Sequence, residues 1–184
     1  MYRFCEEHGV ACERCGKIVV ATTPEEVPAL EKLQQHGTAN GLSGMQWLRA
    51  EQIREYEPYA TGVAALLVPD TGIVDYVRAT ECMAEQVRQH SGTVQTLAKL
   101  IGVKRAADGL TLNTATGDFS CRRLINCGGL QCDRIARMCG LNPSIQIVPF
   151  RGEYYEIVPE RRSLVRNLIY PVPDPRFPFL GVHF

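Results

Sequence analysis

The chain has 184 residues, enough for one large domain or parts of two. Its twenty basic and twenty acidic side chains cancel, which argues against a nucleic-acid-binding surface that depends on bulk charge. No apolar run approaches the ~20 residues of a membrane-spanning helix, so we expect no transmembrane segment.

The first half of the chain alternates helices with short strands. A capping-box pattern at Thr23, Pro24 and Glu26 predicts a helix that runs to about residue 36 and ends at Gly37. The other elements expected in this half are a helix over 1–8 that ends at Gly9, strands at 16–21, 46–48 and 64–68, and a short helix over 49–56.

The second half is expected to contain one helix-then-strand unit followed mainly by strands. Asp75 can cap a helix over 76–90, and residues 93–97 read as the strand that follows it. Glycine turns at 108–109 and 116–117 predict hairpins. The remaining expected elements are strands at 101–105, 109–114, 123–127, 145–150, 153–158, 167–170 and 179–184, and a helix over 131–139.

Eight cysteines lie along the chain. In a small secreted protein they would indicate disulfides, but the first residues lack the apolar core of a signal peptide. Reduced thiols in a cytoplasmic protein are the better interpretation. Cys12 and Cys15 have the C-x-x-C spacing of redox and zinc sites, although zinc needs a second ligand pair and the sequence offers none. A metal-binding module that uses this cysteine pair remains an alternative function.

Residues 124–136 (LINCGGLQCDRIA) are the most informative local segment. An apolar stretch runs directly into two glycines and then a helix. Glycines allow a ligand to approach the backbone closely, and a helix start offers free N–H groups and a partial positive charge. The segment suits a flavin or a pyrophosphate, and a plain tight turn between two elements is the alternative.

This segment resembles the corresponding stretch of FAD-dependent oxidoreductases of the D-amino-acid-oxidase superfamily. Residues 149–155 (PFRGEYY) and 168–184 (LIYPVPDPRFPFLGVHF) are similar to the L-2-hydroxyglutarate oxidases and dehydrogenases within it. The resemblance extends over essentially the whole chain, including Gly16-Lys17 and residues 72–75. It implies an FAD cofactor and the oxidation of a small 2-hydroxy acid to the 2-oxo acid. Oxygen and a quinone both remain open as the electron acceptor.

The resemblance also implies a mixed α/β fold in two parts. Residues 72–140 would be part of a doubly wound FAD-binding domain, and residues 10–70 and 145–184 a mainly antiparallel substrate-binding domain with helices. Members of the family open with a Gly-x-Gly-x-x-Gly loop that holds the FAD pyrophosphate. The chain has no such motif. We therefore expect the chain to be a fragment that binds FAD weakly by itself. We expect the full-length protein to be cytoplasmic, with at most a peripheral association with the membrane.

The resemblance carries several residue roles over to this chain. His183 is the candidate base, since an imidazole can accept a proton near neutral pH; the alternative is a histidine on the solvent face of an edge strand. The candidates for binding the acid substrate are Arg151, Tyr154 and Tyr170. The candidates for contacting FAD are Leu100, Cys127, Gly128, Gly129 and Leu130. A non-catalytic α+β interaction module is the remaining alternative to an enzyme.

Overall fold

The computed structural model describes residues 1–174, 176 and 181–184. The chain divides into two compact units, which are described separately below. Unit 1 comprises residues 1–86 and 156–184, and unit 2 comprises residues 87–155. Within the described residues, no helix is both long enough and apolar enough to cross a bilayer.

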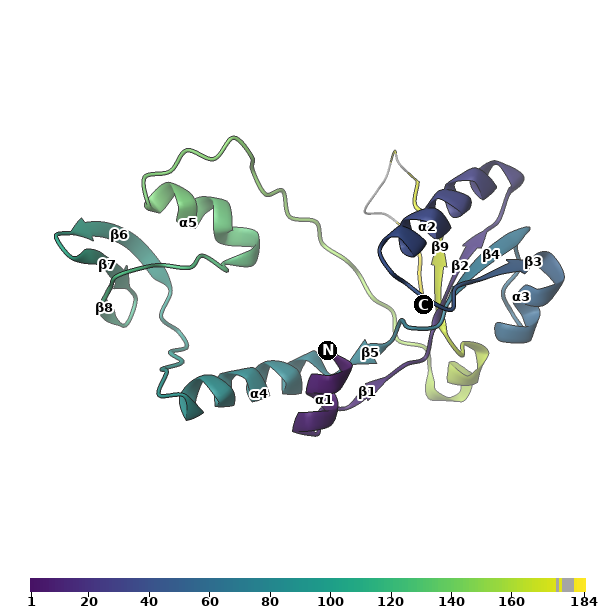
Figure 1. Cartoon of the computed structure of the whole chain (residues 1–184), viewed down its shortest axis with the longest axis horizontal. Helices are drawn as coiled ribbons and strands as arrows, with labels where there is room; N and C mark the ends of the chain where they lie inside the picture. The colour runs from purple at the N-terminus through teal and green to yellow at the C-terminus, as the bar shows by residue number, and fades with distance from the viewer. Residues whose placement is uncertain (175, 177–180) are drawn as a thin grey trace. The chain divides into compact units, whose positions relative to one another are not determined.

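A four-stranded mixed sheet forms the centre of unit 1 (Figure 1). Its strands are β3 (Gln46–Arg49), β4 (Ala64–Val68), β2 (Lys17–Ala21) and β9 (Leu168–Pro171), in that order. The β3–β4 and β4–β2 pairs are antiparallel, whereas β2 and β9 run parallel. All five residues of β4 are buried, because this inner strand is covered on both faces.

Two helices cover opposite faces of this sheet. The chain enters α2 (Val27–Ala39) through a 3-10 turn, η1 (Pro24–Glu26), and Leu30 of α2 packs against Val19 of β2. On the other face, Ile53 of α3 (Ala50–Tyr56) packs against Ile18 and neighbouring apolar residues. Alternate residues of β2 thus enter two different cores, as the period of two in a strand requires.

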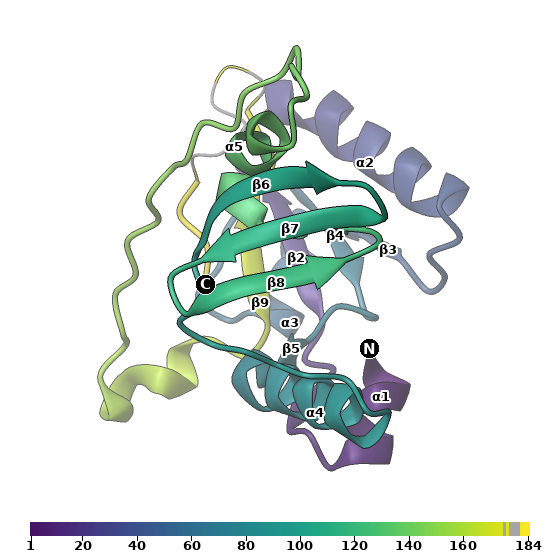
Figure 2. The same cartoon turned by 90° about the vertical axis from the view of Figure 1, so that its left-hand side faces the viewer.

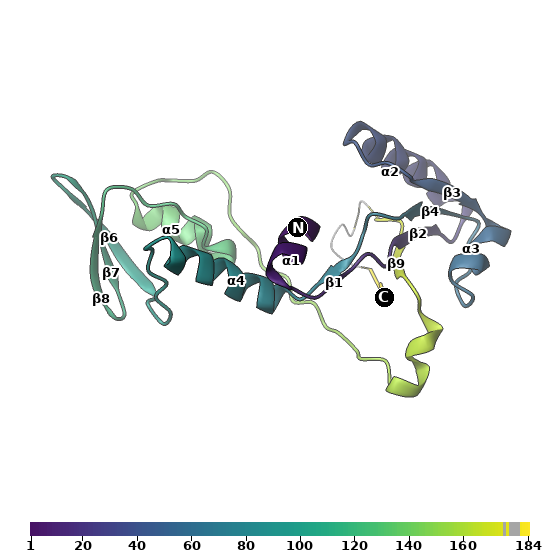
Figure 3. The same cartoon turned by 60° about the horizontal axis from the view of Figure 1, so that its bottom comes forward.

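The N-terminal elements of unit 1 form a smaller cluster (Figure 3). Helix α1 (Tyr2–His8) packs against α4 (Tyr76–Gln89) through Cys5, Ala79 and Cys82. The two-residue strands β1 (Cys12–Glu13) and β5 (Ile73–Val74) pair beside them. The backbone N–H of Arg78 donates to Asp75 Oδ1 at 2.9 Å, which confirms Asp75 as the cap of α4.

Unit 2 contains an antiparallel meander of three strands, β6 (Leu100–Ala106), β7 (Gly109–Thr114) and β8 (Gly117–Cys121) (Figure 2). The chain continues through a 3-10 turn, η2 (Gly129–Gln131), into α5 (Cys132–Met138). A further 3-10 helix, η3 (Pro159–Leu164), belongs to unit 1 and precedes β9.

The expectation of a mixed α/β fold is confirmed, but several expected elements are wrong. The third strand of the meander lies at 117–121 rather than 123–127, because the turn at Thr116–Gly117 returns the chain at once and pairs Cys121 with Leu110. Residues 93–97 form no strand, and Leu97 has a left-handed φ of 59°. Residues 145–150 and 153–158 pair with no described strand, and extended backbone becomes a strand only through such pairing.

Two further expectations need correction. Helix α2 continues through Gly37 to Ala39. Gly37 is buried, and a Cβ there would meet the Met45 sulfur at 2.7 Å, so this glycine allows close packing rather than ending the helix. Of the strand expected at 179–184, residues 179 and 180 lie outside the described residues. Residues 181–184 form no regular strand, although Phe184 and Ile169 exchange two backbone hydrogen bonds of 3.0 Å.

Candidate active site

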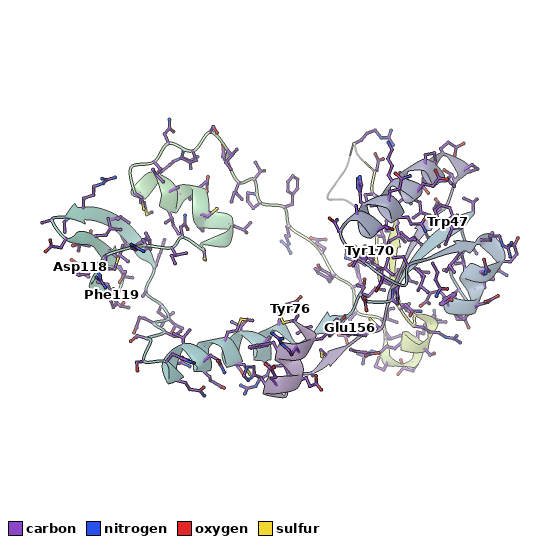
Figure 4. All side chains as sticks on the ribbon, in the orientation of Figure 1. Trp47, Tyr76, Asp118, Phe119, Glu156 and Tyr170 are labelled. Atoms are coloured by element: carbon purple, nitrogen blue, oxygen red, sulfur yellow. The ribbon has the colours of Figure 1, made fainter. Side chains whose placement is uncertain are left out.

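Tyr170 and His183 are brought together at the β9 edge of the unit 1 sheet. Tyr170, labelled in Figure 4, lies opposite Val19 of β2 and packs against the core on the α2 side. The His183 ring stacks on the Tyr170 ring, with centroids 4.6 Å apart and planes 11° from parallel. The Ile169–Phe184 hydrogen bonds hold His183 beside β9. A candidate base and a candidate substrate-binding phenol are therefore neighbours.

Lys17 is a third functional group at this place, although the resemblance included it only as part of Gly16-Lys17 and assigned it no role. It lies two residues before Val19 on β2, so both side chains are on the α2 side of the sheet. Its Nζ lies 5.2 Å from the centroid of the Tyr170 ring, within the range of a cation–π interaction. Only the parallel register of two strands about 150 residues apart brings Lys17 and Tyr170 together.

Glu57, also missed at the sequence level, fixes the start of β9. It is fully buried at the end of α3, and its carboxylate accepts hydrogen bonds from the backbone N–H groups of Arg166 and Asn167 and from the Asn167 side-chain amide. A buried carboxylate is stable only when such donors compensate for its lost hydration. The segment that leads to Tyr170 is thereby tied to α3.

The glycine loop before α5 is held by one asparagine. The Asn126 side-chain amide donates to the Cys132 carbonyl at 2.8 Å, and its Oδ1 accepts from the Gly128 N–H at 3.1 Å. A Cβ on Gly128 would meet Ile135 Cδ1 at 2.5 Å, so only glycine lets the loop pack this closely against the helix. Gly129 adopts φ 53°, with no atoms within 4 Å of a Cβ position.

The predicted FAD-contacting residues all lie in unit 2. Cys127, Gly129 and Leu130 are exposed, so the backbone of the loop is accessible to a ligand. Leu100 is half-buried at the first position of β6, next to an irregularity in its pairing with β7. The exposed loop, its left-handed glycine and the following helix fit the contact of a flavin nucleotide with a backbone.

Arg151 and Tyr154 also belong to unit 2, and both are exposed. The Arg151 Nε lies 3.8 Å from a carboxylate oxygen of Glu153. Tyr154 and Tyr155 are 86% and 95% exposed and are not part of a strand, contrary to the strand expected at 153–158. The substrate-binding roles of Arg151 and Tyr154 stay predictions, as do the other site assignments.

An ion pair on α5 stands beside the glycine loop. Arg137 Nη1 lies 2.9 Å from Asp133 Oδ2, one helical turn away. Burial alone would raise the pKa of Asp133, which is 8% exposed. Hydrogen bonds from the Arg137 guanidinium and the Arg134 N–H, with the charge of Arg137, outweigh burial and lower this pKa. Asp133 is therefore a carboxylate that holds α5 together.

The cysteine pair forms no recognisable metal centre. Cys12 lies exposed in β1 and Cys15 follows it in a loop. Among the residues that the structure describes, no group of three or more His, Cys, Asp or Glu side chains could hold a metal ion. The geometry thus gives no support to the metal-binding alternative.

The family model described as "FAD dependent oxidoreductase" matches residues 1–184. L-2-hydroxyglutarate dehydrogenase from Indibacter alkaliphilus is 48% identical over the whole chain and 46% of its own length. The Escherichia coli K12 enzyme of that name is 40% identical and matches 98% of the chain and 43% of its own length. The human mitochondrial enzyme is 39% identical and matches 100% of the chain and 42% of its own length. The chain thus spans less than half the length of these relatives.

Solved structures show the same fold at lower identity. The L-proline dehydrogenase of P. horikoshii matches 92% of the chain and 46% of its own length, with a TM-score of 0.76 and 16% identity. The L-α-glycerophosphate oxidase of Mycoplasma pneumoniae, solved with FAD bound, matches 89% of the chain and 44% of its own length, with a TM-score of 0.72 and 22% identity.

Proposed function

The chain belongs to the family of FAD-dependent oxidoreductases, and from that premise we propose that its residues serve the oxidation of L-2-hydroxyglutarate, or a related small 2-hydroxy acid, to the 2-oxo acid. The Tyr170–His183 stack carries the proposal, because it pairs a proton acceptor with a hydrogen-bonding phenol. The names of the curated relatives support the choice of substrate. Eight free thiols support a cytoplasmic location.

The reaction divides between cofactor and protein. FAD, when bound, supplies the acceptor for the hydride that leaves C2 of the substrate. His183 takes the proton from the C2 hydroxyl as the carbonyl forms, so that the acid loses two electrons and two protons in all. Tyr170 donates a hydrogen bond that orients the substrate. Arg151 and Tyr154 bind carboxylate oxygens, and the loop at 127–130, with Leu100, contacts FAD. Oxygen and a quinone both remain candidates for reoxidising the flavin.

Replacing His183 in the full-length protein loaded with FAD tests this assignment. His183→Ala should lower kcat about 100- to 10,000-fold, the usual range for general-base help, while flavin content stays unchanged. His36→Ala, in an exposed position on α2, is the matched control. Steady-state kinetics at saturating substrate and flavin absorbance measure both effects. A loss below about tenfold in kcat with full flavin content would remove His183 from the base role.

The 184 residues alone should bind FAD weakly and show no turnover. They contain no Gly-x-Gly-x-x-Gly motif, the loop that supplies most of the anion-binding N–H groups for the pyrophosphate. The flavin absorbance of the purified chain after incubation with FAD and gel filtration measures this. A yellow protein with near-stoichiometric flavin would contradict the expectation.

A further inference from the structure

Lys17 on β2 forms no ion pair with any residue that the structure describes. It is half-buried. The nearby carboxylate of Asp70 pairs with Arg14 instead, at 3.6 Å from its Nη1. A partly desolvated ammonium gains from an anionic partner.

The order of the strands places Lys17 and His183 on opposite flanks of Tyr170. Strand β9 lies between β2, which carries Lys17, and residues 181–184, which carry His183 and are hydrogen-bonded to Ile169. The Lys17 ammonium lies 5.2 Å and the His183 ring 4.6 Å from the same Tyr170 ring. Both groups therefore lie next to the phenol that is the candidate for binding the substrate.

A cavity beside Lys17 and Tyr170 offers room for part of a ligand. It has a volume of about 300 Å³ and lies on the α2 side of the sheet. Lys17 and Tyr170 line it, together with Asp70 and Thr71 and with apolar side chains such as Val19. Apolar walls with few polar groups are typical of small-molecule sites, and Lys17 is the cation that lines this cavity.

We propose that Lys17 binds the carboxylate that lies farthest from C2 of the substrate and so selects dicarboxylic over monocarboxylic 2-hydroxy acids. The inference rests on the proposed function, in which His183 acts at the C2 hydroxyl. Lysine is suited to this role because its ammonium is a compact charge on a flexible stem. Tyr170 holds that ammonium by its cation–π contact.

The test compares two substrates in the FAD-loaded holoenzyme. Lys17→Met keeps the apolar stem and removes the charge. It should lower kcat/KM for L-2-hydroxyglutarate roughly 10- to 100-fold, mainly through KM, the loss expected for one hydrogen bond to a charged group. L-2-hydroxybutyrate, which lacks the far carboxylate, should be oxidised by the variant as by the wild type. Lys17→Arg should retain most of the preference for the dicarboxylate.

Lys32→Met, on the exposed side of α2, is the matched charge-loss control. Equal losses for both substrates in Lys17→Met, or the same loss in Lys32→Met, would overturn the inference. Calorimetric titration with glutarate and butyrate, neither of which can be oxidised at C2, separates binding from turnover. If glutarate binding weakens tenfold or more in Lys17→Met although L-2-hydroxyglutarate is not oxidised, the proposed function fails and the role of Lys17 stands. Unchanged glutarate affinity overturns the role of Lys17 whatever the turnover.

Discussion

The sheet of unit 1 and the meander of unit 2 are built in different ways. Every residue of β4 is buried, and the same sheet joins β2 to β9, about 150 residues further along the chain. Every residue of β7 is only half-buried, and it pairs with its immediate neighbours in sequence. Helices cover both faces of the first sheet, whereas short turns connect the strands of the meander. In unit 1, the pairing of distant strands brings Lys17 beside Tyr170. In unit 2, strands that are neighbours in sequence pair ahead of the glycine loop.

The largest expected effect tests whether buried side chains contribute more to the free energy of unfolding in the unit 1 sheet than in the meander. Leu66→Ala in β4 should lower the free energy of unfolding of unit 1 by about 2–5 kcal/mol, because Leu66 is 2% exposed and its removal leaves a cavity. Leu112→Ala is the matched change at a half-buried position in β7 and should cost clearly less. Urea unfolding followed by circular dichroism measures both. Equal losses would show that the meander has an equivalent core.

A second change tests the link between α3 and β9. Glu57→Ala removes the carboxylate that accepts from the Arg166 and Asn167 N–H groups, and a hydrogen bond to a charged group is worth about 1.5–3 kcal/mol. Hydrogen exchange should quicken at the β9 amides, with smaller change in β4. Glu55→Ala, on the exposed side of α3, is the control. If exchange at Ile169 and Val172 stays as slow as in the wild type, Glu57 does not fix β9.

The third change affects the glycine loop of unit 2. Asn126→Ala removes the hydrogen bonds to Cys132 and Gly128, each worth about 0.5–1.5 kcal/mol. Asn126→Asp keeps the acceptor for the Gly128 N–H and loses only the donor to Cys132, so its cost should be about half. Thermal unfolding and the amide chemical shift of Gly128 report the two contacts separately. An unshifted Gly128 resonance in the alanine variant would contradict the assigned contact.

The same contrast explains what could be predicted from sequence. Strands β2, β4 and β9 and helix α3 were expected close to their observed positions, because apolar runs and capping residues are local signals. The resemblance to a family pointed to Tyr170 and His183. Neither Lys17, which the resemblance included without a role, nor Glu57 was a candidate site residue, since each acts with a partner more than 100 residues away. The strand expected at 123–127 was wrong because hairpin pairing, rather than apolar composition, determines where β8 lies.

The smallest expected effect is a pH dependence confined to unit 2. The Asp133 carboxylate is stabilised in the folded chain by Arg137 and the Arg134 N–H, which lower its pKa. A group with a lowered folded pKa stabilises the fold above its unfolded pKa, about 3.9 for aspartate, and loses this contribution as pH falls through the folded value. The ion pair should thus contribute fully at pH 7 and fade below about pH 4.

Asp133→Asn should therefore lower the melting temperature of unit 2 at pH 7, and the difference from the wild type should shrink as the pH approaches 3. Asp108→Asn, in the exposed turn before β7, removes the same charge from a residue that forms no ion pair within the described part of the chain, and it should show no such convergence. Because Arg137 is partly exposed, solvent screens the pair and keeps the effect below those of Leu66, Glu57 and Asn126. A gap between wild type and Asp133→Asn that persists unchanged to pH 3 would mean that asparagine disturbs packing, and that the charge of Asp133 contributes nothing to α5.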